Sequence, residues 1–354
     1  MSKTFSKFSN EEKVHIWSLI QEGKSLQEIA SIYSKYSRNI DFGVRNGRQW
    51  NDITNLNPIF KNSKRVGYTC RNGLYMVRKN IDGKQKVVYS SRNEQDIINY
   101  YDHCQGDYSI VWHLKTHLSL HYGYWEPDTK RLRDALIKMN DVLAETVKIK
   151  ESDKVLDAGC GVGGAAMYLA EKFNCHAHGI TLSQNQVDFA LNKAKERNLL
   201  DKVSFTAADF TKMPFPDESF DVVWATESVC HAHEKADFLK EAHRVLKKGG
   251  RLIVADFFRT METPNQEEKA LLDNWGKSWA VPHFEYINAF DDKAKMAGFS
   301  STKTKNITQN IMPSAKRLYY CFVPGIICDG FLRAFGRRNK LHKANVWSTY
   351  YQYQ

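Results

Sequence analysis

The sequence predicts an α/β fold, a parallel sheet covered by helices on both faces, preceded by a small basic α+β module. Short apolar runs alternate with helical patterns over the larger part of the chain, as successive strand–helix units do. A glycine-rich turn follows the first of these runs, where such units bind ligands. Charge is uneven: residues 1–95 carry 17 Lys and Arg against 8 Asp and Glu, a net of +9 out of +11 for the whole chain.

The charge step divides the 354 residues into a basic N-terminal module, residues 1–93, and a larger domain, residues 94–354. With 42% hydrophobic residues the chain can bury a substantial core, which excludes a disordered protein. Its seven cysteines show no framework spacing, so we expect reduced thiols in a cytoplasmic protein. The best apolar run, residues 319–332, is interrupted by Pro324 and Gly325 and is too short to span a membrane. The oligomeric state stays open.

The N-terminal module is predicted to contain two short helices and a hairpin. Residues 8–22 begin with a capping box, and residues 26–33 continue at helical spacing after Gly23. Strand-like residues 74–79 and 86–91 flank an Asp-Gly turn. The arrangement weakly resembles a helix-turn-helix with a basic ribbon, which predicts weak, salt-sensitive nucleic-acid binding. Two alternatives stay open: a helical cap and hairpin with no partner, or a fused segment that takes no part in the chemistry.

The larger domain is predicted to open with a helical, aromatic stretch at residues 94–112 and an amphipathic helix at residues 131–146. Five parallel strands follow, at residues 155–157, 176–180, 203–209, 220–225 and 252–256. A turn at residues 247–250 introduces the last of them. Three of these strands end in an acid at the edge where open α/β sheets bind ligands: Asp157, Asp209 and Asp256.

The C-terminal part is predicted to complete the sheet. Helices are expected at residues 261–280 and 291–298. A sixth strand is expected at residues 301–307, and a seventh in the tyrosine-rich end at residues 350–354. The apolar residues 314–335 between them suit either a lid over a hydrophobic substrate or ordinary core.

The glycine-rich turn is the feature around which the larger domain is organised. Gly159, Gly161 and Gly163 stand at alternate positions, which allows positive φ and leaves no β-carbon between the backbone and a ligand. Asp157 ends the strand before them. Because glycine turns also end ordinary strands, the segments that follow decide whether this one binds a cofactor.

Those segments support a resemblance. Residues 155–164 look like the cofactor loop of class I S-adenosylmethionine-dependent methyltransferases. Further segments stand at family spacing, at residues 179–183, 208–209, 213–217, 220–224 and 246–250. The resemblance covers roughly residues 95–354, and these segments are specific as a set. The resemblance implies a Rossmann-like, seven-stranded methyltransferase sheet with helices on both faces, and S-adenosylmethionine as the cofactor.

Within that family the sequence is most similar to the branch of sterol C-methyltransferases, tocopherol-type methyltransferases and cyclopropane-fatty-acid-type synthases. Residues 226–232 are similar to the sterol-type segment after the fourth strand. Residues 181–186 are similar to the cyclopropane-synthase cofactor segment. Thr181 stands where most class I members have an acid that binds the ribose, a departure that this branch shares.

The resemblance also implies which residues bind the cofactor. Asp157 would order the glycine loop or meet the ammonium group through water. Asp209 would accept a hydrogen bond from the adenine amino group, with Phe210 against the ring. The full predicted set is Asp157, Gly159, Gly161, Gly163, Thr181, Leu182, Ser183, Gln186, Asp209 and Phe210.

Catalytic roles are predicted for Glu227, His231 and Tyr122, because methyl transfer to a carbon or a protonated atom needs a proton acceptor. The resemblance places Glu227 near the methionyl part of the cofactor or the reacting centre. Four aromatic residues are candidates to line the acceptor site: Tyr101, Trp125, Trp275 and Trp279. His and Cys residues near the second and fourth strands do not match a zinc-site spacing, so no metal is expected.

The predicted function is methyl transfer from S-adenosylmethionine to a small, hydrophobic acceptor, with a carbon of an isoprenoid, sterol-like or aromatic compound favoured. N- or O-methylation of a natural-product intermediate is the second reading. A nucleic-acid-targeted methyltransferase that uses the basic module is a third, although residues 226–229 lack the Asn-Pro-Pro-Tyr type of motif. A degenerate fold that only binds a ligand is disfavoured by the intact glycine loop and acids.

Overall fold

The computed structural model describes residues 66–71, 74–81, 84–90, 97–98, 100–101, 104, 111–112, 114–336, 338 and 340–353. The chain divides into two compact units, Met1–Gln95 and Asp96–Gln354. The predicted helices at residues 8–22 and 26–33 lie outside the described residues. Of the predicted helical stretch at residues 94–112, the described residues 97, 98, 100, 101, 104 and 111 are helical and residue 112 is not.

The first unit contains a three-stranded antiparallel sheet in the order β1-β2-β3. Its strands are β1 (Val66–Arg71), β2 (Leu74–Ile81) and β3 (Lys84–Ser90). The predicted pairing of β2 with β3 is confirmed, with Ile81 opposite Lys84 at the end of the ladder. The Asp-Gly turn itself lies outside the described residues. Strand β1 is not among the predicted strands. The sequence pattern that indicates it is the placement of Val66, Tyr68 and Cys70 at every second position.

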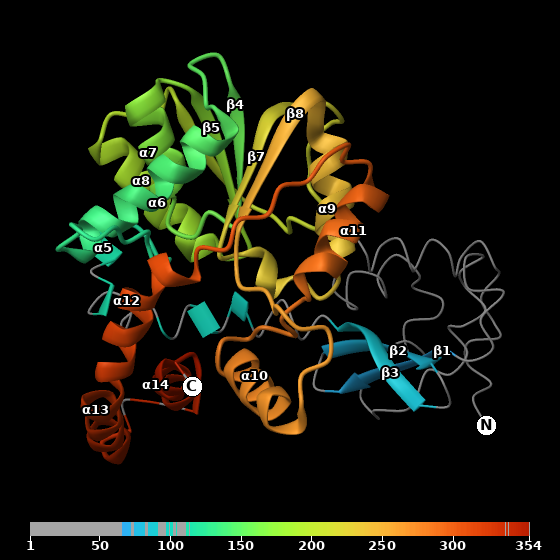
Figure 1. The fold of residues 1–354 in the computed structure, drawn as a ribbon, viewed down its shortest axis with the longest axis vertical. Coiled ribbons are helices and arrows are strands. Elements are labelled where there is room, and N and C mark those ends of the chain that lie inside the picture. The colour runs from blue at the N-terminus through green and yellow to red at the C-terminus, as the bar shows by residue number, and fades with distance from the viewer. Residues whose placement is uncertain are drawn as a thin grey trace, which may run out of the picture. The chain divides into compact units, whose positions relative to one another are not determined.

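A five-stranded parallel sheet in the order β6-β5-β4-β7-β8 forms the centre of the second unit (Figure 1). The strands are β4 (Lys154–Ala158), β5 (His176–Thr181), β6 (Val203–Ala207), β7 (Phe220–Thr226) and β8 (Leu246–Ala255). All five predicted strands are confirmed. Because β4 pairs with β5 on one side and β7 on the other, the winding reverses at β4, and the carboxyl ends there form the usual ligand position of open α/β sheets.

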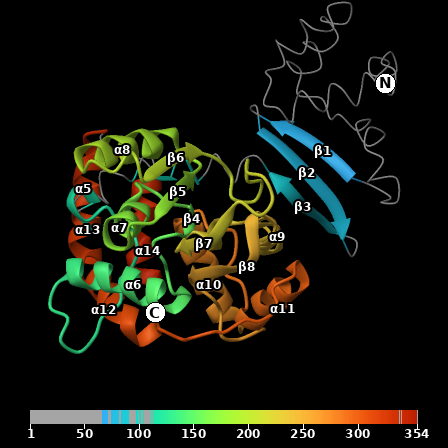
Figure 2. The same ribbon diagram turned by 90° about the horizontal axis from the view of Figure 1, so that it is seen from above.

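Helices cover both faces of this sheet, since successive strand residues point to opposite sides. One face packs Val155, Ala177 and Val222 against α6 (Leu132–Val147), α7 (Gly164–Phe173) and α8 (Gln184–Glu196). The other face packs Leu156, Ile180 and Val223 against α9 (Lys235–Val245) and α11 (Ile287–Ala297). Figure 2 shows these two helical layers on either side of the strands.

Strand β8 begins earlier than predicted, because residues 247–250 form a bulged part of the strand. Phe220 pairs with Leu246, and the next pair along the ladder joins Val222 to Arg251. Gly249 has a φ of 76° and nothing lies within 4 Å of where its β-carbon would stand. The predicted turn is therefore present as an excursion inside β8, at the amino end of the sheet.

The predicted sixth and seventh strands are wrong within the described residues: the parallel sheet has five strands. Residues 301–307 are irregular and mostly exposed, so no burial favours pairing there. Tyr350 and Tyr351 of the tyrosine-rich end lie in α14 (Lys340–Tyr351), and residues 352–353 form a turn after it. Aromatic residues at spacings of three and four suit a helix as well as a strand, and Trp347 contacts both Tyr350 and Tyr351 on the same helix.

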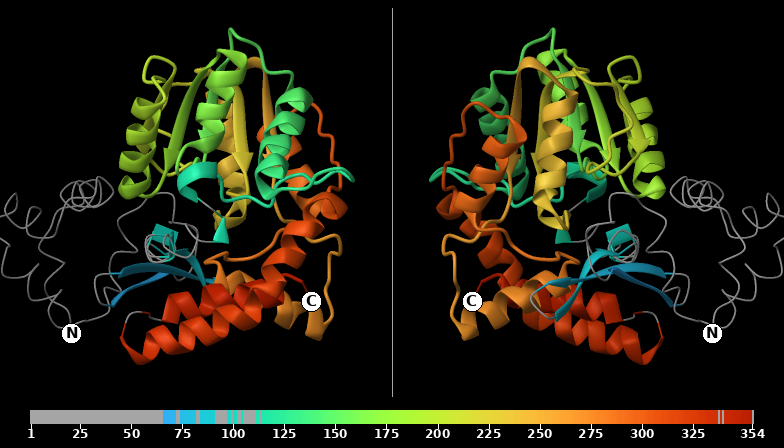
Figure 3. Two further views of the ribbon diagram at one scale, coloured as in Figure 1. Left: turned by 90° about the vertical axis from the view of Figure 1, so that its left-hand side faces the viewer. Right: turned by 90° about the vertical axis from the view of Figure 1, so that its right-hand side faces the viewer.

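The remaining helices lie beyond the carboxyl ends of the strands (Figures 1 and 3). They are α5 (Leu114–His117), α10 (Gln266–Ser278), α12 (Thr308–Tyr320) and α13 (Phe322–Ala334), together with α14. The predicted helices at residues 261–280 and 291–298 correspond to α10 and α11. In the part of the chain that the structure describes, no helix combines the length and apolarity needed to cross a membrane.

Candidate functional site

The glycine loop joins β4 to α7 and holds an open position at its centre. The backbone N–H groups of Gly159 and Cys160 both donate to the carbonyl of Ile180, at 2.9 Å, which fixes the loop to the end of β5. A β-carbon at Gly159 would stand 2.4 Å from the β-carbon of Ser228. At Gly161, with a φ of 52°, an added β-carbon would meet nothing within 4 Å. The loop is packed on one side and open at Gly161.

Asp157 lies at the carboxyl end of β4 and is 3% exposed. Its Oδ2 atom has no hydrogen-bond partner among the described residues. Burial raises the pKa of this carboxyl to about 7, against a smaller opposing effect of the backbone N–H of Ala166. A buried carboxylate oxygen without a partner is suited to a ligand that carries a positive charge or a hydrogen-bond donor.

The end of β5 is held by a short polar network made of predicted cofactor residues. Ser183 caps α8, and its Oγ accepts a hydrogen bond from the backbone N–H of Gln186 at 3.4 Å. The hydroxyl of Thr181 donates to Oε1 of Gln186 at 2.5 Å. All three side chains are buried, and Leu182 between them is half-buried. The structure therefore brings these residues together beside the glycine loop.

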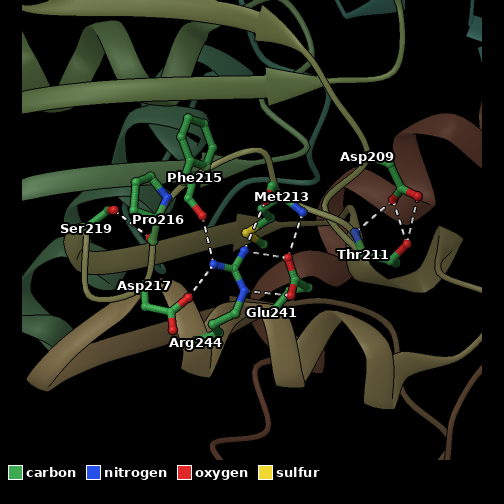
Figure 4. Close-up of polar contacts among 9 residues, drawn as sticks. All are labelled: Asp209, Thr211, Met213, Phe215, Pro216, Asp217, Ser219, Glu241 and Arg244. Atoms are coloured by element: carbon green, nitrogen blue, oxygen red, sulfur yellow. Dashed lines mark hydrogen bonds and ion pairs between the residues drawn. The ribbon is translucent and has the colours of Figure 1, made fainter. Parts of the chain in front are cut away.

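Asp209 and Phe210 follow β6. Both carboxylate oxygens of Asp209 accept hydrogen bonds from the hydroxyl of Thr211, at 2.8 and 2.7 Å (Figure 4). The backbone N–H of Thr211 donates to Oδ1 of Asp209 at 2.7 Å. The ring of Phe210 packs edge-on against Phe238 of α9, with ring centres 5.4 Å apart. These contacts orient the carboxylate, whose Oδ2 atom keeps capacity for a further donor.

Arg244 of α9 anchors the segment that follows Asp209 (Figure 4). Its guanidinium donates to the carbonyls of Met213 and Phe215, at 3.0 and 2.7 Å. It also pairs with the carboxylates of Glu241 and Asp217, each at 2.8 Å. A guanidinium can satisfy several acceptors at once, so one side chain fixes this loop to α9. The sequence resemblance covers residues 213–217 but gives no role to Arg244.

Glu227 stands directly after β7 in a backbone conformation that is uncommon for a residue with a side chain. Its φ is 49°, and its N–H donates to the carbonyl of Ala255 at 2.7 Å. Its Oε1 atom accepts the backbone N–H of Tyr122 at 2.9 Å. Burial raises the pKa of the Glu227 carboxyl well above its usual range, and the nearby carboxylate of Asp256 adds to this effect.

His231 lies in a short 3₁₀ turn, η5 (Val229–His231), close to Glu227 in sequence. Its Nε2 atom is 2.9 Å from the hydroxyl of Tyr101, and its Nδ1 atom is 3.4 Å from the carbonyl of Ala280. Burial lowers the pKa of His231 to about 4, so the ring is neutral at pH 7. Burial also raises the pKa of Tyr101, as do charges on Cys230 and Glu227.

Two ionisable residues outside the predicted set, the buried Lys235 and the half-buried Asp256, hold η5 in place. Lys235 donates to the carbonyls of Cys230, Ala232 and His283, at 2.9, 2.7 and 3.0 Å. Asp256 accepts the backbone N–H of Cys230 at 2.9 Å. Asp256 could be found from its place at a strand end. Lys235 could not, because a lysine in an amphipathic helix is ordinarily a surface residue.

Tyr122 reaches the site through its backbone. Its ring packs edge-on against Phe257 and Trp279, with centres 5.2 and 6.1 Å apart, and its hydroxyl donates to Oε1 of Gln352. Trp275 joins the same aromatic cluster through contacts with Phe257 and Trp279. The predicted lining residues Tyr101, Trp275 and Trp279 thus lie in the region of Glu227 and His231. Trp125 instead donates from its indole to Ser314, at 2.8 Å.

The site suits a cationic ligand. Asp157, Glu227 and Asp256 follow or end neighbouring strands, and burial raises the pKa of all three carboxyls. A positive charge bound beside them would recover part of the free energy that burial removes from their ionised forms. Among the side chains that the structure describes, no group of three His, Cys, Asp or Glu is arranged to hold a metal ion.

We expect Asp157→Asn to change how stability depends on pH. The carboxyl has an ordinary pKa of 3.8 and a folded-state pKa of about 7, so the folded protein holds the proton more tightly and loses stability as pH rises from about 4 to about 7. Asparagine mimics the neutral carboxyl, so the variant should not lose stability over this pH range. At pH 8 its free energy of unfolding should exceed that of the unmodified protein by at most about 4 kcal/mol. Urea unfolding of both proteins between pH 4 and pH 8 measures the difference.

Asp153 is the matched control, because it is buried just before the same strand and pairs with Arg251. Asp153→Asn removes an ion pair and should lower stability at pH 7. Parallel pH profiles for Asp157→Asn and the unmodified protein would show that Asp157 does not titrate in this range.

Comparison with known proteins agrees with the geometry. Residues 156–254 match the family described as methyltransferase domain. The chain is 30% identical over 232 residues to the methyltransferase GfsG of Streptomyces halstedii, covering 65% of this chain and 81% of that protein. It is 32% identical over 197 residues to the 27-O-demethylrifamycin SV methyltransferase of Amycolatopsis mediterranei, covering 55% and 72%.

A solved structure shows the same fold. The geranyl diphosphate C-methyltransferase of Streptomyces coelicolor, crystallised with Mg²⁺, geranyl diphosphate and S-adenosyl-L-homocysteine, aligns with a TM-score of 0.55 at 18% identity, over 73% of this chain and 93% of that one. The five-stranded sheet, the glycine loop beside the buried Asp157 and the similarity over most of a curated methyltransferase lead to one assignment. The chain belongs to the class I S-adenosylmethionine-dependent methyltransferases.

Proposed function

We propose that this enzyme transfers the methyl group to a hydroxyl oxygen of a small acceptor with an apolar body. The observation that carries the proposal is the Tyr101–His231 pair, in which the tyrosine hydroxyl is 2.9 Å from the imidazole Nε2 atom, close to Glu227. A hydroxyl group that is methylated must give up a proton, so it needs an acceptor within hydrogen-bond reach. The printed name of the rifamycin methyltransferase, a relative at 32% identity, describes an O-methylation and supports the same reading.

The pair is arranged to take up that proton. With Nδ1 of His231 donating to the carbonyl of Ala280, Nε2 is the acceptor nitrogen and takes the hydrogen bond from the hydroxyl of Tyr101. The raised pKa of Tyr101 keeps its hydroxyl protonated, while the lowered pKa of His231 keeps the ring neutral. Tyr101 can therefore receive the acceptor's proton at its oxygen as it passes its own proton to His231.

Glu227 has a second role beside this relay. S-adenosylmethionine supplies a methyl group on a positively charged sulfur. The carboxyl of Glu227, oriented by the backbone N–H of Tyr122, would lie beside that charge or beside the polar end of the acceptor. Near a cation its pKa would fall and it would ionise, which adds electrostatic stabilisation to the reacting centre.

Cofactor binding is assigned to the residues around the glycine loop. The methionyl part would pass the open position at Gly161 and the free Oδ2 atom of Asp157. Thr181, with Ser183 and Gln186, would contact the ribose side, and Asp209 with Phe210 the adenine. The support is their common position at the carboxyl ends of β4, β5 and β6.

Methylation of a carbon is the second candidate, and the aromatic cluster favours it. Attack by a carbon–carbon double bond leaves a carbocation, which aromatic faces stabilise. Phe257, Trp275 and Trp279 lie together next to Tyr122, ring centres 5.3 to 5.8 Å apart among the three. The sequence alone favours this candidate, whereas the Tyr101–His231 pair favours the hydroxyl acceptor.

The two candidates are separated by labelling. The full chain is incubated with a metabolite extract and S-adenosylmethionine carrying carbon-13 in the methyl group, and the products are examined by mass spectrometry and NMR. The chemical shift of the labelled methyl distinguishes a methyl ether from a carbon-bound methyl. A methyl ether on an apolar compound is expected. A carbon-bound methyl would replace the hydroxyl proposal by the second candidate.

A further inference from the structure

Helix α13 exposes an apolar stripe to solvent. Val323, Ile327, Phe331 and Phe335 follow one another at intervals of four residues, and each is 64–68% exposed. Each step of four residues advances about 40° around a helix, so the four side chains cover an arc of about 120° on one face. Tyr320 at the end of α12, 66% exposed, continues the stripe. Contiguous exposed apolar residues of this size mark an interaction surface.

The polarity of α13 is inverted relative to a helix that packs into a water-soluble core. Its buried residue is Asp329, which is ion-paired with Arg333 and Arg338 at 3.9 and 3.7 Å. The inner side also packs Phe322 against Trp347 of α14. The aliphatic and aromatic stripe faces outward instead. The predicted alternatives of core or substrate lid for residues 314–335 do not describe this face.

The segment that contains the stripe is basic. Residues 315–354 contain seven Lys and Arg and one acid, Asp329, a net of +6. Lys316 is exposed one turn before Tyr320, with its ammonium 6.0 Å from the tyrosine ring, and Lys343 is exposed on α14. Exposed Phe and Ile side chains beside Lys and Arg are the composition of helices that lie in the surface of an anionic membrane.

We propose that the α13 stripe binds an anionic lipid bilayer, with the helix lying along the surface. Charge and apolar area together favour a bilayer over other binding partners of the stripe. A second copy of the chain would bring two segments of net +6 together, and the basic residues 1–95 would likewise meet like charge. Nucleic acid would satisfy the charge but would not bury Val323 or Ile327. A bilayer with anionic headgroups satisfies both the charge and the apolar face.

The position of the stripe gives such binding a use. Helices α12, α13 and α14 lie beyond the carboxyl ends of the strands, on the side of the reaction site (Figures 1 and 3). Gln352, just past α14, accepts the hydroxyl of Tyr122, whose backbone N–H contacts Glu227. An apolar acceptor concentrates in a bilayer, so docking here would bring the enzyme to its substrate. The surface itself can be tested without knowing the acceptor.

The test is sedimentation of the full chain with vesicles of phosphatidylcholine alone or with added phosphatidylserine. The unmodified protein should bind the anionic vesicles at least about tenfold more tightly than the neutral ones. The double variant Ile327→Glu, Phe331→Glu should lose at least about tenfold in affinity for anionic vesicles, because it removes apolar contact and adds negative charge. Lys343→Glu should lower the affinity for anionic vesicles by a smaller factor than the double variant does.

Met296→Glu on α11 is the matched control, since Met296 is 87% exposed and lies outside the stripe. It should bind vesicles as the unmodified protein does. Circular dichroism melting checks that the variants are folded, and Val323→Glu gives a second, single change on the same stripe.

Three results would overturn the proposal. Equal vesicle binding by the stripe variants and the unmodified protein would assign the binding to another basic surface. Absence of vesicle binding would remove the lipid partner. A dimer in analytical ultracentrifugation that dissociates on Phe331→Glu would identify a second copy as the occupant.

Discussion

Gly161→Leu should abolish binding of S-adenosylmethionine while leaving the protein folded. The open position at Gly161, where an added β-carbon meets nothing within 4 Å, can hold the side chain, but that space is assigned to the cofactor. We expect a loss of at least about 100-fold in affinity by calorimetry, about 2.7 kcal/mol. Because φ at this residue is 52°, a side chain also costs about 1–2 kcal/mol of stability.

Gly249→Leu is the control for that cost of stability. Gly249 also has a positive φ, 76°, and open space around it, but it lies in the bulge at the amino end of β8. The variant should lose similar stability and bind the cofactor normally. Normal binding by Gly161→Leu would remove the cofactor from this position. Weak binding by both variants would show that strain, and not occupied space, causes the loss.

Glu227→Gln should lower kcat by about 10²–10⁴-fold, with the acceptor identified by the labelling experiment. In the unmodified protein the backbone N–H of Tyr122 donates to Oε1 of Glu227 at 2.9 Å. The amide oxygen of glutamine can accept the same hydrogen bond, so the segment stays in place while the ionisable group is lost. Affinity for S-adenosylmethionine should change by less than about tenfold. Initial rates and calorimetry on the same preparations measure the two effects.

Glu227→Ala is the companion variant, because it removes the hydrogen bond to Tyr122 as well as the carboxyl. It should lose stability in addition to activity, since the buried N–H then has no acceptor. If Glu227→Gln turns over normally, the carboxyl has no part in the reaction, whatever Glu227→Ala does.

Some residues of the candidate site could be predicted from local sequence pattern, and others come together only through tertiary contacts. Asp157, the alternate glycines and Thr181 are readable in sequence because each stands at a fixed place next to a strand end. Their parallel pairing, β4 between β5 and β7, follows from the alternation of strands and helices. The roles given to these residues remain proposals for the binding and kinetic experiments.

Several contacts join residues far apart in sequence, and no local pattern announces them. Tyr122 meets Glu227, Tyr101 meets His231, and Arg244 meets the carbonyls of residues 213 and 215. Lys235 is buried because three carbonyls from two segments converge on its ammonium group. Such groups are buried only after the whole unit has packed, so hydropathy along the chain does not reveal them.

In the C-terminal part, sequence pattern alone does not distinguish a strand from a helix. Spacing of Tyr350, Tyr351 and Tyr353 fits both a strand and a helix, and contacts of Tyr350 and Tyr353 with Tyr319 of α12 belong to the helical arrangement. The direction of the apolar stripe on α13 likewise depends on which side packs against α14.

The sequence by itself determined the five parallel strands and the glycine-rich turn after β4, because strand–helix alternation and strand-end residues are local properties, and its motifs resemble those of the methyltransferase family. Only the tertiary structure decided that the parallel sheet has five strands in the described residues, that Glu227 and the Tyr101–His231 pair lie in one region, and that the apolar stripe of α13 is exposed. These depend on long-range packing, in which burial sets both the conformation of a segment and the protonation of its side chains.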